Sequence, residues 1–84
     1  MQSQLTKQYR EVKNKYNAIV LFKVGSFYET MCGSAIIMHK ITGCTLTRNI
    51  DNKPLAGFES TYIDKYLKLL IKAGCKVALV EETI

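Results

Sequence analysis

The sequence has no tryptophan, one proline and one histidine among its 84 residues, and it has no long apolar run. Its apolar stretches are short and are interrupted by lysine or polar residues, which excludes a transmembrane helix. No apolar segment with a small-residue cleavage site opens the chain, so we expect no secretory signal. Because 48% of the residues are hydrophobic, the chain is not a disordered tail. Its length fits one small domain over residues 1–84.

Acidic residues are in the minority, with 7 Asp and Glu against 12 Lys and Arg, and the formal net charge is +5 at pH 7. A basic chain suits a polyanionic partner such as nucleic acid or an acidic membrane surface. A positive charge spread over the whole surface would instead serve solubility. Composition leaves both interpretations open.

Cysteine is also scarce, since Cys32, Cys44 and Cys75 are an odd number and lack the C-x-x-C spacing. This usage disfavours a disulfide framework and favours a reducing compartment. Each thiol has apolar neighbours in the sequence, so we expect buried, inert cysteines. Cys32 or Cys44 together with His39 would leave a zinc ligand set incomplete, and the sequence therefore predicts no metal site.

Motifs of catalysis are missing from the sequence. The chain contains no G-x-x-x-x-G-K-[ST] segment and therefore no phosphate-binding loop of its own. It has no recognisable arrangement of serine or cysteine with histidine and an acid, and no carboxylate cluster that would bind a nuclease metal. We therefore predict that the chain is not itself an enzyme and holds no cofactor.

The pattern of apolar residues predicts an α+β fold, in which a mixed β-sheet packs with about three helices. Thr61-x-x-Asp64 is typical of a capping box at the start of the last helix, which ends at Gly74. Gly43 follows a shorter helix that has Ser34 as its N-cap. The expected helices cover residues 2–16, 34–41 and 61–73, and the expected strands cover residues 18–24, 27–31, 44–48 and 76–80, with a short extended piece at 55–58.

The segment over residues 24–29 carries the most informative arrangement. If it is extended, Phe27 and Glu29 project from one face of a strand while Tyr28 projects from the other. An aromatic ring and a carboxylate then stand side by side next to Gly25, where another molecule can approach the backbone closely. The alternative interpretation places Phe27 in the core and Glu29 at its rim.

Residues 20–29, with the sequence VLFKVGSFYE, resemble the segment LLF-(Y/K)-x-G-D-F-Y-E of the MutS DNA mismatch-repair family. The correspondence extends in order from about Thr6 to Glu82. The further similar segments are Leu46-Thr47-Arg48 with L-T-(K/R), Pro54-Leu55-Ala56-Gly57 with P-M-A-G, and residues 66–78 with Y-L-x-x-L-(V/I)-x-x-G-x-x-V-A.

The resemblance implies the N-terminal mismatch-recognition domain of that family, whose partner is double-stranded DNA with mismatches or small loops. In that family the Phe of the F-x-E motif is wedged into the duplex from the minor groove and stacks on a mispaired base, and the Glu hydrogen-bonds to that base. Carried over, Phe27 is the wedge and Glu29 the base contact. Lys23, Arg48 and Lys53 lie near or after the motif and are candidate phosphate contacts. Because phosphates surround it, we expect the pKa of Glu29 to be raised in the complex.

The resemblance also implies a longer parent protein. This parent would be a homodimeric ATPase that binds ATP and Mg²⁺ outside the present sequence and has no membrane partner. The expected location is a bacterial cytoplasm with its nucleoid, or another reducing compartment. The isolated domain is expected to be a monomer.

Three departures from the family pattern keep a second interpretation open. Ser26 stands where the family has an acidic residue, and the loop over residues 49–53 is shorter. Phe58-Glu59-Ser60-Thr61 stands in place of a run of the Ile-Pro-(Tyr/His)-His type. The alternative is a divergent interaction or structural domain that keeps the fold and no longer discriminates mismatches.

Overall fold

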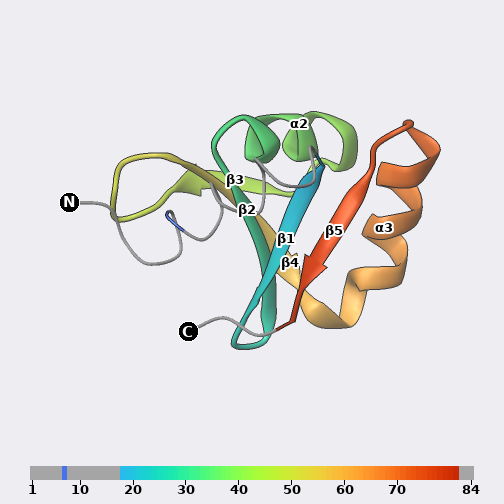
Figure 1. Ribbon diagram of the computed structural model, residues 1–84, viewed down its shortest axis with the longest axis horizontal. Coiled ribbons are helices and arrows are strands. Elements are labelled where there is room, and N and C mark those ends of the chain that lie inside the picture. The colour runs from blue at the N-terminus through green and yellow to red at the C-terminus, as the bar shows by residue number, and fades with distance from the viewer. Residues whose placement is uncertain (1–6, 8–17, 82–84) are drawn as a thin grey trace.

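The computed structural model describes residue 7 and residues 18–81, and Figure 1 shows their arrangement. The helix expected over residues 2–16 lies outside the described residues, apart from Lys7. The elements in chain order are β1 (Ile19–Val24), β2 (Phe27–Met31), α2 (Cys32–Thr42), β3 (Thr45–Arg48), β4 (Pro54–Glu59), the 3-10 turn η1 (Ser60–Tyr62), α3 (Ile63–Lys72) and β5 (Val77–Val80).

The strands form one sheet in the order β3-β4-β2-β1-β5. Strands β1 and β5 pair in parallel, and the other neighbouring pairs are antiparallel. The mixed sheet with its helices confirms the predicted α+β fold. The described residues contain two α-helices and one 3-10 turn, against about three helices expected for the whole chain.

Both helices begin differently from the prediction. Helix α2 starts at Cys32 directly after β2, with φ of 60° at Cys32 where the strand turns into the helix, so Ser34 is not its N-cap. The capping box at Thr61 is also wrong, because the N-cap of α3 is Tyr62 and no side chain caps this helix. The N–H of Ile63 donates to the carbonyl of Ser60, which places Thr61 inside a helical turn where its hydroxyl cannot act as a cap.

Strand β1 carries the most deeply buried part of the sheet, since Val20, Leu21 and Phe22 are fully buried. Successive side chains of a strand point to opposite faces. Val20 and Phe22 pack with Met31 on one face, and Leu21 packs on the face covered by α2 and α3. The core on the helix face consists of Ile19, Leu21, Tyr28, Ala35, Met38, Cys44, Ala56, Phe58 and Leu70.

The three cysteines are free. Cys44 is buried, whereas Cys32 and Cys75 are half-buried, so the expectation of fully buried thiols holds for Cys44 alone. Within residues 7 and 18–81, no helix is long and apolar enough to cross a membrane. Over the same part of the chain, no three His, Cys, Asp or Glu side chains come together as potential metal ligands.

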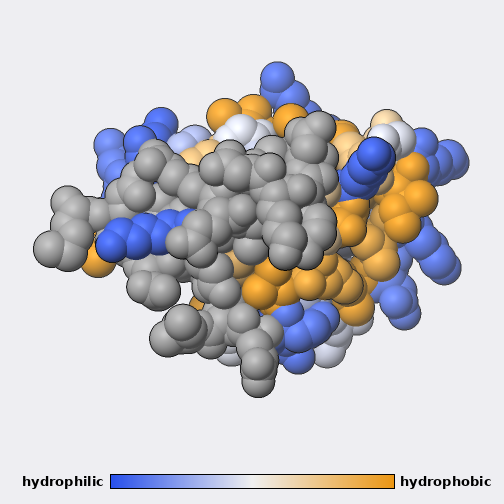
Figure 2. Space-filling view, in the orientation of Figure 1, coloured by the Kyte–Doolittle hydropathy of each residue, from blue (hydrophilic) through white to orange (hydrophobic). Residues whose placement is uncertain are grey.

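Helix α3 presents lysines to solvent, and Figure 2 shows hydrophilic side chains beside apolar ones at the edge of the molecule that it forms. Lys65, Lys68 and Lys72 are exposed on this helix. Leu69 and Ile71 are exposed between them. Part of the positive charge therefore lies on α3.

Candidate nucleic-acid interface

A tight turn joins β1 to β2 and sets the position of the residues that follow it. Gly25 in this turn has φ of +59°, a conformation that glycine adopts without the steric cost of a Cβ atom. The N–H of Ser60 donates to the carbonyl of Ser26 over 2.8 Å, so the residue directly after β4 holds the turn from its other side. Phe27, the first residue of β2, is thereby fixed at the tip of the hairpin.

Phe27 and Glu29 lie on the same face of the sheet, as the two-residue spacing predicts. In the β1–β2 ladder Phe27 is opposite Val24 and Glu29 is opposite Phe22. Phe27 is 44% exposed, so the alternative interpretation that buried it in the core is wrong. Glu29 is half-buried beside it. An exposed aromatic ring and a carboxylate thus stand together on one surface.

Glu29 owes its position to a glycine on the neighbouring strand. It is opposite Gly57 in the β2–β4 ladder. A Cβ atom on Gly57 would lie 2.8 Å from the Tyr28 carbonyl oxygen and 3.1 Å from Glu29 Cγ, which leaves no room for a side chain. Burial raises the pKa of the Glu29 carboxyl because partial loss of water disfavours its charged form.

A shallow groove of about 470 Å³ begins at these two residues and continues over β4 toward β3 and α3. Carboxylates, hydroxyls and aromatic rings line it together. This combination suits a flat ligand with hydrogen-bonding edges, such as a nucleobase. The lining residues are Phe27, Glu29, Gly43, Cys44, Thr45, Thr47, Leu55, Gly57, Phe58, Glu59, Tyr62 and Tyr66.

Tyr28 anchors β2 from the opposite face. Its hydroxyl lies 2.8 and 3.0 Å from the two carboxylate oxygens of Glu81, to which it donates. This hydrogen bond, together with burial, raises the pKa of the Tyr28 hydroxyl. The Tyr28 ring lies 5.9 Å from that of Phe58, which stacks on Tyr66 at 4.3 Å. The strand that carries Phe27 is therefore held by aromatic packing and a hydrogen bond behind it.

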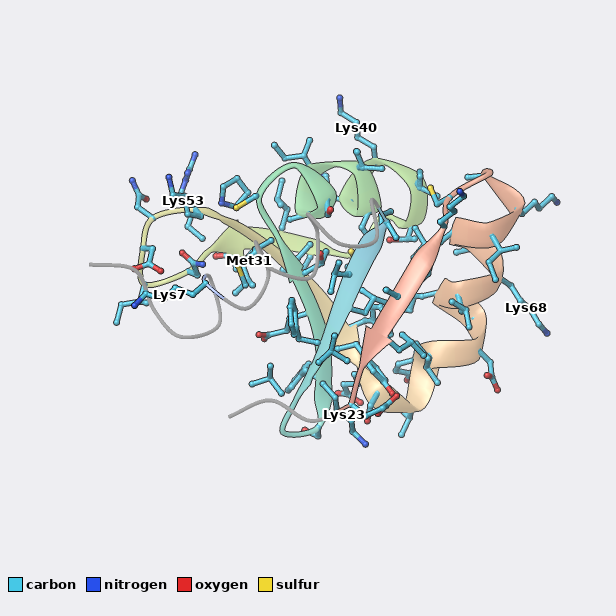
Figure 3. All side chains as sticks on the ribbon, viewed as in Figure 1. Lys7, Lys23, Met31, Lys40, Lys53 and Lys68 are labelled. Carbon is cyan, nitrogen blue, oxygen red and sulfur yellow. The ribbon has the colours of Figure 1, made fainter. Side chains whose placement is uncertain are left out.

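The three candidate phosphate contacts do not gather at one place. Lys23 is opposite Tyr28, close to Phe27 in the hairpin but on the other face of the sheet. Arg48 is paired with Pro54, and its guanidinium donates to the carbonyl of Asn52 over 2.9 Å. Figure 3 shows Lys53 at the upper left of the molecule and Lys23 at its lower edge.

The ladder between β2 and β4 gives the scale of this separation. Glu59, the partner of Phe27, is five residues along β4 from Pro54, the partner of Arg48. Five strand residues span about 17 Å. Only Lys23 is therefore near the Phe27–Glu29 pair, and Arg48 and Lys53 lie at the far end of β4.

Sequence reasoning missed the groove residues Thr45, Thr47 and Glu59 as members of the site. In the sequence, Glu59 is distinguished only as part of a departure from the family pattern. Its place beside Phe27 depends on the register between β2 and β4, which pairs residues 32 positions apart. Glu81 was also missed, and its contact with Tyr28 links residues separated by 53 positions.

Comparison with known proteins identifies the class to which this fold and surface belong. The MutS domain I family matches residues 3–84. Proteins named DNA mismatch repair protein MutS are similar to the chain: that of Flavobacterium psychrophilum is 46% identical over 83 residues, that of Porphyromonas gingivalis 40% over 87, and that of Fervidobacterium nodosum 42% over 79. These matches cover 93%, 98% and 93% of the chain.

The chain belongs to the MutS family of DNA mismatch-repair proteins and is a MutS domain I. It spans about 10% of the length of these relatives. The resemblance found in the sequence is confirmed by the family match.

Proposed function

We propose that this domain binds double-stranded DNA and detects mismatched or looped-out bases, with Phe27 as the wedge and Glu29 as the base contact. The observation that carries the proposal is the exposed ring of Phe27 next to the half-buried carboxyl of Glu29 on one face of the sheet. A ring at a hairpin tip can enter a duplex without unfolding the domain, because Tyr28 holds the strand from behind.

Insertion of Phe27 between base pairs explains how a mismatch is recognised without direct readout of the base sequence. Separating stacked bases costs a few kcal/mol per step, and the cost is lower where pairing is already defective. A mismatch therefore differs from a matched pair chiefly in its deformability. Lys23 adds affinity through phosphate without sequence preference, and Arg48 and Lys53 contact phosphates farther along the duplex.

Glu29 contributes through its protonation. A carboxylate close to phosphates is repelled unless it meets a donor or takes up a proton. The pKa of Glu29 is already raised by burial, so uptake of a proton on binding is easier than for an exposed glutamate. The protonated carboxyl can then donate a hydrogen bond to a ring nitrogen of the mispaired base.

In this proposal the chain is one domain of a larger protein. Because its relatives are about ten times as long, we infer a parent MutS protein that is a homodimer and hydrolyses ATP with Mg²⁺ outside this sequence. The domain itself contributes binding and no catalytic group. Its location is the cytoplasm with the nucleoid.

Replacement of the wedge tests the proposal directly. In the protein that contains the chain, Phe27→Ala is expected to weaken binding to a single-mismatch duplex by about 1–3 kcal/mol, because the ring no longer stacks on a base. Binding to matched duplex changes little, since phosphate contacts remain. The control is Ile50→Ala, which truncates a side chain that is 90% exposed in the β3–β4 loop. If Phe27→Ala retains full discrimination in a fluorescence-anisotropy titration, the domain is instead the divergent interaction module.

A further inference from the structure

Glu59 lies opposite Phe27 in the β2–β4 ladder, on the face of the sheet that carries the wedge. Directly opposed residues of an antiparallel pair have Cβ atoms about 4.5–5.5 Å apart. The pairing persists to the end of β4, where the N–H of Ser60 donates to the carbonyl of Ser26. The carboxylate of Glu59 therefore leaves the backbone next to the Phe27 ring.

Gly57 lets the side chain of Glu29 lie over β4, on the side of the groove that also carries Glu59. Glu29 is opposite Gly57, and Glu59 follows two residues later on the same face of β4. All three residues line the groove beside Phe27. A group that enters the groove there meets the carboxyl of Glu29 and the carboxylate of Glu59.

Within the part of the chain that the structure describes, the carboxylate of Glu59 shows no structural role. The side chain is exposed, and within residues 7 and 18–81 it has no hydrogen-bond or ion-pair partner. A free carboxylate close to a duplex is repelled by phosphates. Glu59 can favour a DNA complex only where it meets a hydrogen-bond donor.

We propose that Glu59 is a specificity-determining residue, whose carboxylate accepts a hydrogen bond from the 2-amino group of a guanine in the mispair. The inference rests on the proposed function and on the entry of the wedge from the minor groove, which the family resemblance implies. There the guanine 2-amino group is the donor that base pairs present, whereas A·T pairs present acceptors alone. Glu59 thus makes the domain prefer mispairs that contain guanine.

In a G·T wobble pair the 2-amino group makes no hydrogen bond to thymine, so inosine, whose base is guanine without that group, removes it without altering the pairing. The experiment measures the affinity of the protein that contains the chain for G·T and I·T mismatches, with the matched G·C duplex as the reference. Wild type is expected to lose about three- to tenfold in G·T affinity on replacement of guanine by inosine, the size of one partly exposed charged hydrogen bond. Glu59→Ala is expected to bind both mismatches equally.

Two further variants make the comparison specific. Asp64→Ala removes an equally exposed carboxylate from α3, and it is expected to respond to inosine as wild type does. Glu59→Gln keeps a carbonyl acceptor without the charge and is expected to retain part of the response, which also covers the case of a poorly folded Glu59→Ala. An inosine response in Glu59→Ala or Glu59→Gln as large as that of wild type overturns the proposal.

Failure of this inference is distinguishable from failure of the proposed function. If Phe27→Ala still discriminates mismatched from matched duplex, the wedge mechanism is wrong and the Glu59 contact falls with it. If Phe27→Ala loses discrimination while Glu59→Ala responds to inosine like wild type, the wedge stands and only the role of Glu59 is refuted.

Discussion

The side chain of Glu29 lies against the bare Cα of Gly57 on the neighbouring strand, where a Cβ atom would come within 3.1 Å of Glu29 Cγ. This contact joins two segments that the sequence separates by 28 positions. It makes the position of the proposed base contact dependent on the absence of a side chain on β4.

Gly57→Ala is expected to destabilise the domain by about 1–3 kcal/mol, the usual cost of forcing an extra methyl group into packed atoms. The methyl would lie 2.8 Å from the Tyr28 carbonyl oxygen, which is backbone and cannot move aside cheaply. Denaturant unfolding measures the change. Gly33→Ala is the matched control, because a Cβ there meets nothing within 4 Å and α2 gains helix propensity. Equal effects of the two substitutions would contradict the steric account.

The stability of the domain is expected to depend on the ionisation of Glu29. Because its folded-state pKa is raised above the ordinary value of 4.5, the favourable contribution of the neutral carboxyl is fully present below that value. This contribution is lost as the pH rises through the folded-state pKa. Glu29→Gln, which stays neutral, should therefore become more stable than wild type as the pH rises through this window, measured by urea unfolding at each pH.

Asp64→Asn serves as the control for that pH series. Asp64 is an exposed acid in the first turn of α3, where a negative charge favours the helix terminus. Its neutralisation should lower stability at neutral pH, the opposite sign to Glu29→Gln. A Glu29→Gln variant whose advantage over wild type does not grow with pH would show that the carboxyl is not desolvated.

Thr30→Val is expected to stabilise the domain by about 1 kcal/mol, since it removes a polar atom that burial leaves unsatisfied and keeps the β-branched shape. Thr30 is fully buried, and within residues 7 and 18–81 its Oγ1 has no hydrogen-bond partner. Thr42→Val is the contrasting substitution, because the Thr42 hydroxyl donates to the carbonyl of Met38 and accepts from the N–H of Cys44. Thermal unfolding should move in opposite directions for the two variants, and a lower Tm for Thr30→Val would refute the prediction.

Tyr28→Phe is expected to destabilise the domain by about 1 kcal/mol, the net contribution of one hydrogen bond. The substitution keeps the ring that packs on Phe58 and removes the hydroxyl that donates to Glu81. Tyr62→Phe removes a hydroxyl from an exposed ring and should change the unfolding free energy little. The bond is the source of the Tyr28 effect only if Glu81→Ala costs a similar amount and the double variant costs no more than either single one.

Local patterns in the sequence decided much of the fold. The apolar run in β1 and the alternation in β2 predicted two strands with Phe27 and Glu29 on one face, and the register confirms this shared face. The first residue of each helix was harder to predict, because Cys32 adopts a left-handed φ and a 3-10 turn precedes α3. No side chain caps the first turn of either helix, and a capping side chain is the signal that a motif search finds.

The sequence by itself determined the α+β class, the family and the shared face of Phe27 and Glu29, because periodicity and motif order act over short separations along the chain. Only the tertiary structure decided that Phe27 is exposed, that Glu59 flanks it and that Arg48 and Lys53 lie at the far end of β4. These facts follow from which strands pair and in what register. Strand pairing is a property of segments distant in sequence, so no local pattern of residues contains it.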